Sequence, residues 1–228
     1  MASLGLGLLL LIVAFVIFPT QRGAPKVEPL ETVKLPGPKF DGKLPVEGAL
    51  QKRRSIPEYR ADPLTLEEIS QLLWACQGVT APEGRRTAPS AGALYPLEIS
   101  LVVGRVEGLQ KGIYKYRPRP HELAKMANED QRAPLASAAL NQEFVQNGAV
   151  VLVIAAVYDR TAKQYGSRGA RYVHMEAGAA AENVCIQAVS LGLGTVTVAA
   201  FNDREVKRTL GLPSDEEPLY LMPIGRTK

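Results

Sequence analysis

The segment Pro89-Ser90-Ala91-Gly92-Ala93-Leu94-Tyr95-Pro96 combines small residues, a hydroxyl and two prolines, directly before an apolar run at residues 97–103. Small side chains let a flat ligand approach the backbone, and the prolines restrict the path of the chain. Ser90 and free backbone N–H groups can bind the polar rim of a ring system. The segment therefore predicts a ring-binding loop, although an ordinary turn has the same composition.

Arg53, Arg54 and Ser55 follow a short segment, residues 45–52, that we expect to be helical. Guanidinium groups present planar sets of donors that match phosphate oxygens. Read alone, the two arginines also fit a solvated basic patch. Together with the ring-binding loop they indicate flavin mononucleotide (FMN), which carries a flat ring and a phosphate.

An ordered series of motifs extends this reading over residues 46–228. The series comprises Arg53 to Tyr59 (RRSIPEY), Leu64 to Ala75, Arg86 to Glu98, Tyr172 to Gly178 (YVHMEAG), Gly192 to Thr195 (GLGT), Leu210 to Pro213 (LGLP) and Pro223 to Arg226 (PIGR). In this order the motifs resemble the nitroreductase superfamily of FMN enzymes, and most closely its SagB-type branch. That branch includes dehydrogenases that oxidise azoline rings in modified peptides.

The resemblance implies an α+β, nitroreductase-like fold, with a central, mostly antiparallel sheet flanked by helices, and a homodimer with flavin sites between subunits. It assigns the phosphate and ribityl end of FMN to Arg53, Arg54 and Ser55, with help from Arg226. One side of the flavin ring would contact the loop, at Pro89, Ser90, Ala91 and Gly92. The other side would contact a second segment, at Val198, Ala199 and Ala200. Many family members have an acid followed by glycine where Ala199 and Ala200 stand here.

Periodicity independently favours an α+β sandwich, because strand-like and helix-like segments do not alternate regularly. Helices are expected at residues 65–76, 132–140, 142–145, 170–191 and 203–210, and strands at 97–103, 112–116, 121–126, 149–157, 195–200 and 219–224. The run at 149–157 is continuously apolar, which predicts a strand covered on both faces. No Gly-x-Gly-x-x-Gly follows a strand, which disfavours a Rossmann fold.

The amino-terminal part divides into two non-globular segments. Residues 1–20 contain an uncharged apolar run at 2–18, which predicts a membrane anchor or a secretory signal. Residues 21–44 are rich in Pro and Gly and predict an extended tether, and residues 45–228 form the FMN domain. Positive charges after the run place an anchored domain on the cytoplasmic side. A cleaved signal would instead make the protein secreted or periplasmic.

Composition excludes several other classes. The net charge of +4 is scattered among acids, without a basic stripe that would indicate nucleic acid binding. Cys76 and Cys185 are far apart, and with only His121 and His174 available we expect no metal site.

For catalysis we single out Tyr95, beside the loop, and Tyr172, at the start of the long helix; either phenol could move a proton near a flavin. Glu176 and Glu182 are six residues apart and are assigned no acid–base role.

The expected activity is ping-pong electron transfer from NAD(P)H through FMN to a small nitro, quinone or similar acceptor. One alternative is a peptide azoline dehydrogenase that uses FMN and oxygen and works with a cyclodehydratase partner. Another is a membrane-tethered flavin-binding module without turnover.

Overall fold

The computed structural model describes residues 28–228. The expected anchor or signal at residues 1–20 lies outside this range. Within it, none of the helices has the length and apolar character needed to cross a membrane.

The described residues form a seven-stranded sheet in the order β1-β4-β3-β2-β5-β7-β6. Every pair of neighbouring strands is antiparallel, which confirms the expected sheet type. The strands are β1 (Glu31–Lys34), β2 (Leu97–Val103), β3 (Gly112–Arg117), β4 (Glu122–Ala127), β5 (Val150–Ala156), β6 (Leu193–Thr195) and β7 (Glu217–Arg226).

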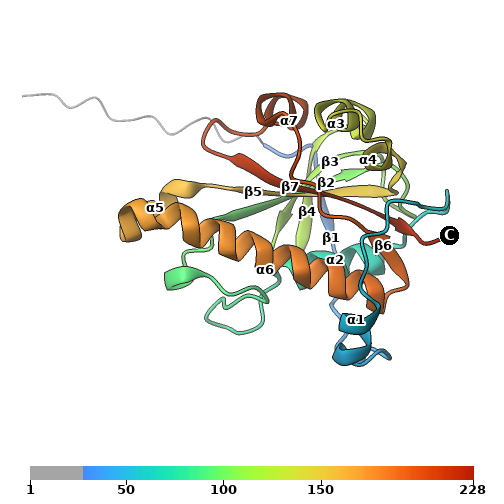
Figure 1. Ribbon diagram of the computed structural model, residues 1–228, viewed down its shortest axis with the longest axis horizontal. Coiled ribbons are helices and arrows are strands. Elements are labelled where there is room, and N and C mark those ends of the chain that lie inside the picture. Colours follow the sequence, from blue (N-terminus) through green and yellow to red (C-terminus); the bar gives the residue numbers. More distant parts are fainter. Residues whose placement is uncertain (1–27) are drawn as a thin grey trace, which may run out of the picture.

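Helices pack on both faces of this sheet, as expected for the α+β class (Figure 1). Helices α1, α2 and α6 lie on one face, α3, α4 and α7 lie on the other, and α5 directly precedes α6. Their bounds are α1 (Val46–Lys52), α2 (Leu66–Gln77), α3 (Arg132–Ala138), α4 (Glu143–Asn147), α5 (Tyr158–Tyr165), α6 (Gly169–Ser190) and α7 (Asp203–Leu210).

Strand β5 lies between the two layers and is buried along its whole length. Leu152 and Ile154 join the hydrophobic cluster under α2 and α6, whereas Val151 and Val153 join the cluster under α3 and α7. This alternation follows from the two-residue side-chain period of a strand. The apolar run at 149–157 is therefore a strand covered on both faces, as predicted.

Helix α2 begins at a capping box. Thr65 accepts a hydrogen bond from the Glu68 backbone N–H, and the Glu68 carboxylate accepts one from the Thr65 N–H at 2.8 Å. Such caps satisfy N–H groups that have no partner within the helix. The box fixes where α2 starts, and α2 then packs against α6.

Three segments differ from the sequence expectations. Residues 31–34, inside the expected tether, form β1 against β4, and the next residue, Leu35, is buried. Residues 158–165 form helix α5, which we did not predict. The strand expected at 195–200 lies instead at Leu193–Thr195, because this stretch pairs with the end of β7, and beyond it only Val198 makes a bridge, to Leu221.

Candidate functional site

Arg53 and Arg54 lie directly after α1, where this helix packs against α6. The Arg53 Nε is 3.6 Å from a carboxylate oxygen of Glu182 on α6. The Arg54 guanidinium donates to the backbone carbonyls of Gln51 and Arg53, at 3.1 and 2.6 Å. Both side chains are at least partly accessible, so each retains N–H donors that could bind an anion.

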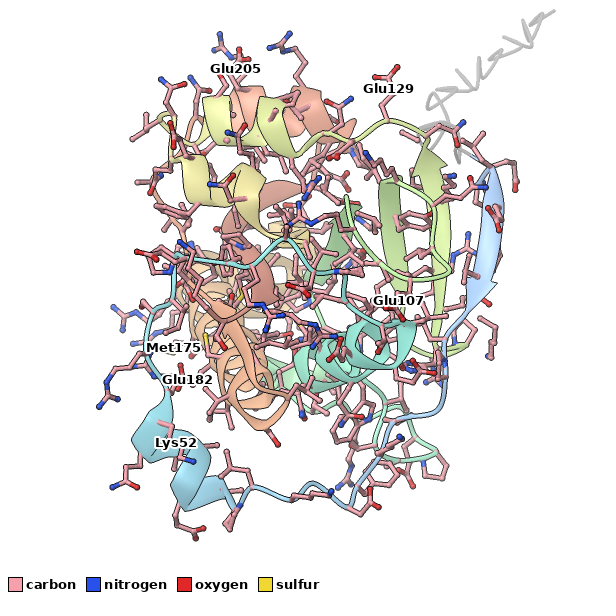
Figure 2. The ribbon with its side chains drawn as sticks, turned by 90° about the vertical axis from the view of Figure 1, so that its right-hand side faces the viewer. Lys52, Glu107, Glu129, Met175, Glu182 and Glu205 are labelled. Carbon is pink, nitrogen blue, oxygen red and sulfur yellow. The ribbon has the colours of Figure 1, made fainter. Side chains whose placement is uncertain are left out.

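A cavity of about 150 Å³ opens beside this arginine pair. Lys52 and Arg54 contribute positive charge to it, and Thr195 and Cys185 line its inner side. Lys52 is labelled in Figure 2, on the side of the molecule that also carries Glu182. Sequence reasoning named the arginines and missed Lys52, although a third cation directly before them was a readable signal.

The segment Pro89–Pro96 forms a tight loop with a 3-10 turn at Ala91–Ala93. Gly92, Ala93 and Tyr95 all have positive φ angles, of 61°, 53° and 48°. Left-handed backbone is strained for residues other than glycine, so surrounding contacts must hold the loop in this shape. One of these contacts is the bond from the Tyr95 N–H to the Ser90 Oγ, at 2.9 Å.

Charged side chains fix Tyr95, one of the two predicted catalytic phenols. The Arg86 guanidinium lies 4.4 Å from the centre of the Tyr95 ring, a distance typical of a cation–π contact. Arg160, on α5, donates to the Tyr95 carbonyl at 3.1 Å and pairs with Glu98. Burial lowers the pKa of Arg86 although nearby acids oppose this change.

Tyr172, the other predicted phenol, reaches the same region from α6. Its ring meets the Tyr165 ring edge to face, with centroids 5.0 Å apart. A β-carbon added at Gly92 would lie 2.9 Å from the Tyr165 hydroxyl. Tyr95 is therefore part of the loop, and Tyr172 is connected to the loop through the ring of Tyr165.

Val198, Ala199 and Ala200 lie elsewhere in the same chain. Val198 exchanges backbone hydrogen bonds with Leu221, and the Ala200 carbonyl accepts one from Gln142. Val198 belongs to the hydrophobic cluster under α3 and α7, on the opposite face of the sheet from α6. The structure thus does not bring this segment against the loop within one chain. It follows Thr195, however, which lines the cavity beside the arginines.

Arg226, assigned by resemblance to the phosphate, has a different partner in the chain. Its guanidinium donates to both carboxylate oxygens of Glu68, at 2.9 and 3.1 Å, and its Nε donates to the Pro63 carbonyl at 3.2 Å. This bidentate pair ties the end of β7 to the cap of α2. The described geometry gives Arg226 a structural contact that sequence reasoning did not include.

Glu176, which the sequence reasoning set aside, is buried directly beneath the loop. Its side chain lies on α6 and is 4% exposed. Burial raises the pKa of its carboxyl from 4.5 to about 7, while the Ser90 hydroxyl, Arg86 and Gln77 oppose this rise. A carboxyl with this pKa can hold or release a proton near neutral pH.

Comparison with known proteins agrees with this fold and these motifs. Residues 50–226 match the model of the Nitroreductase family. A protein of Methanocaldococcus jannaschii, whose name assigns it to the nitroreductases, is 51% identical over 181 residues, which cover 79% of this chain and 90% of that protein. The microcin B17-processing protein McbC of Escherichia coli is 29% identical over 133 residues, 56% of this chain and 49% of McbC.

Solved structures show the same relationship. A crystal structure from Ralstonia eutropha JMP134, whose description also assigns it to the nitroreductases, matches with a TM-score of 0.77 and 30% identity. The match covers 90% of this chain and 96% of the other. This chain therefore belongs to the nitroreductase family of oxidoreductases.

Proposed function

We propose that the protein is an FMN-dependent oxidoreductase that transfers electrons in a ping-pong cycle from NAD(P)H to a nitro, quinone or similar acceptor. The observation that carries this proposal is the loop Pro89–Pro96, in which Ala93 and Tyr95 hold strained, left-handed backbone and Pro89 and Gly92 are exposed. A chain tolerates such strain when the fixed shape serves a ligand. Small residues on an exposed, rigid loop suit the face of a flat ring.

The phosphate half of the site fits an anion. Lys52 and Arg54 line the cavity beside α1, Arg53 lies between them in the chain, and Ser55 follows. Arginine and lysine donate charge-assisted hydrogen bonds to phosphate oxygens. We therefore assign the phosphate of FMN to this cavity, with Arg226 kept as a structural residue unless flavin binding displaces Glu68.

The two halves of the proposed site support a homodimer. The arginine cavity lies beside the carboxyl-terminal part of α6, at Cys185 and Val189, whereas the ring-binding loop lies beside Glu176, further toward the amino end of the same helix. A second copy can place its loop against the first copy's cavity and so complete the site. Apolar side chains on α1 and α6 stay exposed and suit this contact: Val46, Leu50 and Met175. Figure 2 shows Met175, Glu182 and Lys52 on the same side of the molecule.

FMN, when bound, supplies the hydride-accepting and hydride-donating chemistry. The chain has to hold the ring, keep one face open to substrate and supply protons. The loop backbone would support the ring, Ala199 and Ala200 offer N–H groups but no carboxylate, and we assign proton transfer to the phenols of Tyr95 and Tyr172.

A second candidate is the oxidation of peptide azolines, with FMN and oxygen and a cyclodehydratase partner. The similarity to McbC, whose name describes processing of microcin B17, favours this candidate. The match covers about half of each chain, so it supports the reaction class less strongly than the family match supports flavin chemistry. A flavin-binding module without turnover is the third candidate.

The absorption spectrum of the purified full-length protein tests the central proposal. We expect a flavin spectrum, with FMN as the cofactor released on denaturation, and bleaching of this spectrum by NADH or NADPH without oxygen. Protein that binds no flavin, even after incubation with FMN, would refute the proposal. Flavin that bleaches only with a peptide azoline would favour the second candidate, and flavin that neither substrate reduces would favour the third.

A further inference from the structure

A cluster of buried polar side chains lies between α2, α6 and the ring-binding loop. Its centre is the Glu176 carboxyl, whose Oε1 is buried and has no hydrogen-bond partner among residues 28–228. The Gln77 Nε2, at the end of α2, is likewise buried and unpaired within that range. Gln77 still lies close enough to Glu176 to oppose the rise of its pKa, so the two side chains are neighbours that miss full hydrogen-bond geometry. A buried carboxyl with incomplete hydrogen bonding is costly and calls for a functional explanation.

The positive charge in this cluster comes from Arg86. Its guanidinium donates to the Gln77 Oε1 at 2.8 Å and stacks on the Tyr95 ring, and it also interacts with the Glu176 charge. Other charged or titratable groups near Arg86 are Glu98 on β2, Arg160 on α5, the buried thiol of Cys76 on α2 and the phenol of Tyr116 on β3. Arg86 can therefore stabilise Glu176 when the carboxyl loses its proton.

Ser90 links this cluster to the outer side of the loop. Its Oγ accepts the Tyr95 N–H, so the hydroxyl proton is free to be donated, and the Ser90 hydroxyl also faces the Glu176 carboxyl. Ser90 is only half-buried, whereas Glu176 is almost completely buried. A hydroxyl can accept one proton while it donates another, which makes Ser90 a short bridge from a buried acid to the proposed ring face.

We propose that Glu176 is a positioning and proton-storing residue for the ligand on this loop, and that it exchanges protons with that ligand through the Ser90 hydroxyl. In the forward step the Glu176 carboxyl gives its proton to Ser90 Oγ, and Ser90 releases its own hydroxyl proton to a ligand that has gained negative charge from a hydride donor. The carboxylate that remains is stabilised by Arg86 and regains its proton from solvent. This inference rests on the proposed flavin function for the identity of the ligand.

The first test follows the Glu176 carboxyl itself, by carbon NMR of protein labelled at glutamate, without added flavin. Glu176→Gln assigns the signal, and Glu129→Gln, at an exposed position far from α6 (Figure 2), serves as the matched control. We expect a titration near pH 7 in the wild type. Because the Ser90 hydroxyl favours the ionised carboxyl, Ser90→Ala should move this titration to higher pH. A titration in the ordinary glutamate range, or one that Ser90→Ala leaves unchanged, would overturn the proposal.

The second test uses protein loaded with FMN and measures the reduction potential of the bound flavin against pH. A proton store coupled to the ring should produce a change of slope near pH 7, which Glu176→Gln removes and Glu129→Gln retains. Identical pH dependence in the wild type and Glu176→Gln, with flavin bound in both, would refute the coupling. Absence of flavin binding would instead refute the proposed function, and the NMR titration would still report on Glu176.

Discussion

Replacing Arg226 with Gln tests whether this residue stabilises the fold or binds a phosphate. The Arg226–Glu68 pair is bidentate and partly buried, with the two side chains 29% and 16% exposed. Exposed ion pairs contribute ~0–1 kcal/mol, and breaking a buried pair costs ~3–5 kcal/mol. The intermediate burial places the loss for Arg226→Gln at about 2 kcal/mol of unfolding free energy.

In a domain of this size, a loss of about 2 kcal/mol lowers the melting temperature by about 4–8 °C. Thermal unfolding followed by circular dichroism measures this change, and flavin retention is measured on the same samples. Glu68→Gln should cause a similar loss, and the double variant should lose less than the sum, because both changes break one pair. A variant Arg226→Gln with an unchanged melting temperature and lost flavin would refute this reasoning and assign Arg226 to the phosphate.

Three further predictions concern the candidate site. Arg53→Ala should weaken FMN binding about ten- to a hundredfold, since a charge-assisted phosphate contact contributes ~1.5–3 kcal/mol; flavin fluorescence during dialysis measures this, and unchanged affinity would remove Arg53 from the site. Gly92→Val should lose flavin, because a β-carbon at this position would lie 2.9 Å from the Tyr165 hydroxyl, on backbone with a φ of +61°, and would distort the ring-binding loop. The control Gly37→Val, whose β-carbon would enter open space, should retain flavin in the same assay. Glu176→Gln should flatten the pH dependence of the unfolding free energy. The pKa of Glu176 is about 7 in the folded protein against an ordinary 4.5, so the wild type loses stability as the pH rises through this interval. At pH 8 the variant should therefore be more stable than the wild type by up to about 3 kcal/mol in urea unfolding, and an unchanged pH dependence would contradict the raised pKa.

The elements that sequence could predict are those with a strong local pattern. The apolar run of β5 and the small-residue helix α6 were both located within a residue or two, because burial repeats along each of them. Helix α5 was missed because its residues are mostly polar and only Thr161 is buried. Strand β6 was misplaced because Gly192-Leu193-Gly194 reads as a helix stop, while the strand exists only by pairing with β7.

The candidate site divides in the same way. The ring-binding loop and the arginine pair are continuous in sequence, so residue types alone identified both. Contacts between distant segments could not be predicted from the sequence. Arg226 and Glu68 are 158 positions apart and come together only because the end of β7 lies beside the cap of α2 in the folded chain. The position of Val198–Ala200 on the other face of the sheet likewise depends on how the strands are ordered.

Glu176 is the residue that a different reading of the sequence could have found. It was compared with Glu182, six positions along α6, as if the two acids had to act together. The buried side of α6 instead runs through Val173, Glu176, Ala177 and Ala180, at helical spacings of three and four. A carboxyl inside such an apolar stripe is costly unless other groups compensate for it, so its position alone predicts partners from neighbouring elements. Those partners are the loop and the end of α2, and the partly exposed Glu182 on the other side of the helix needs none of them.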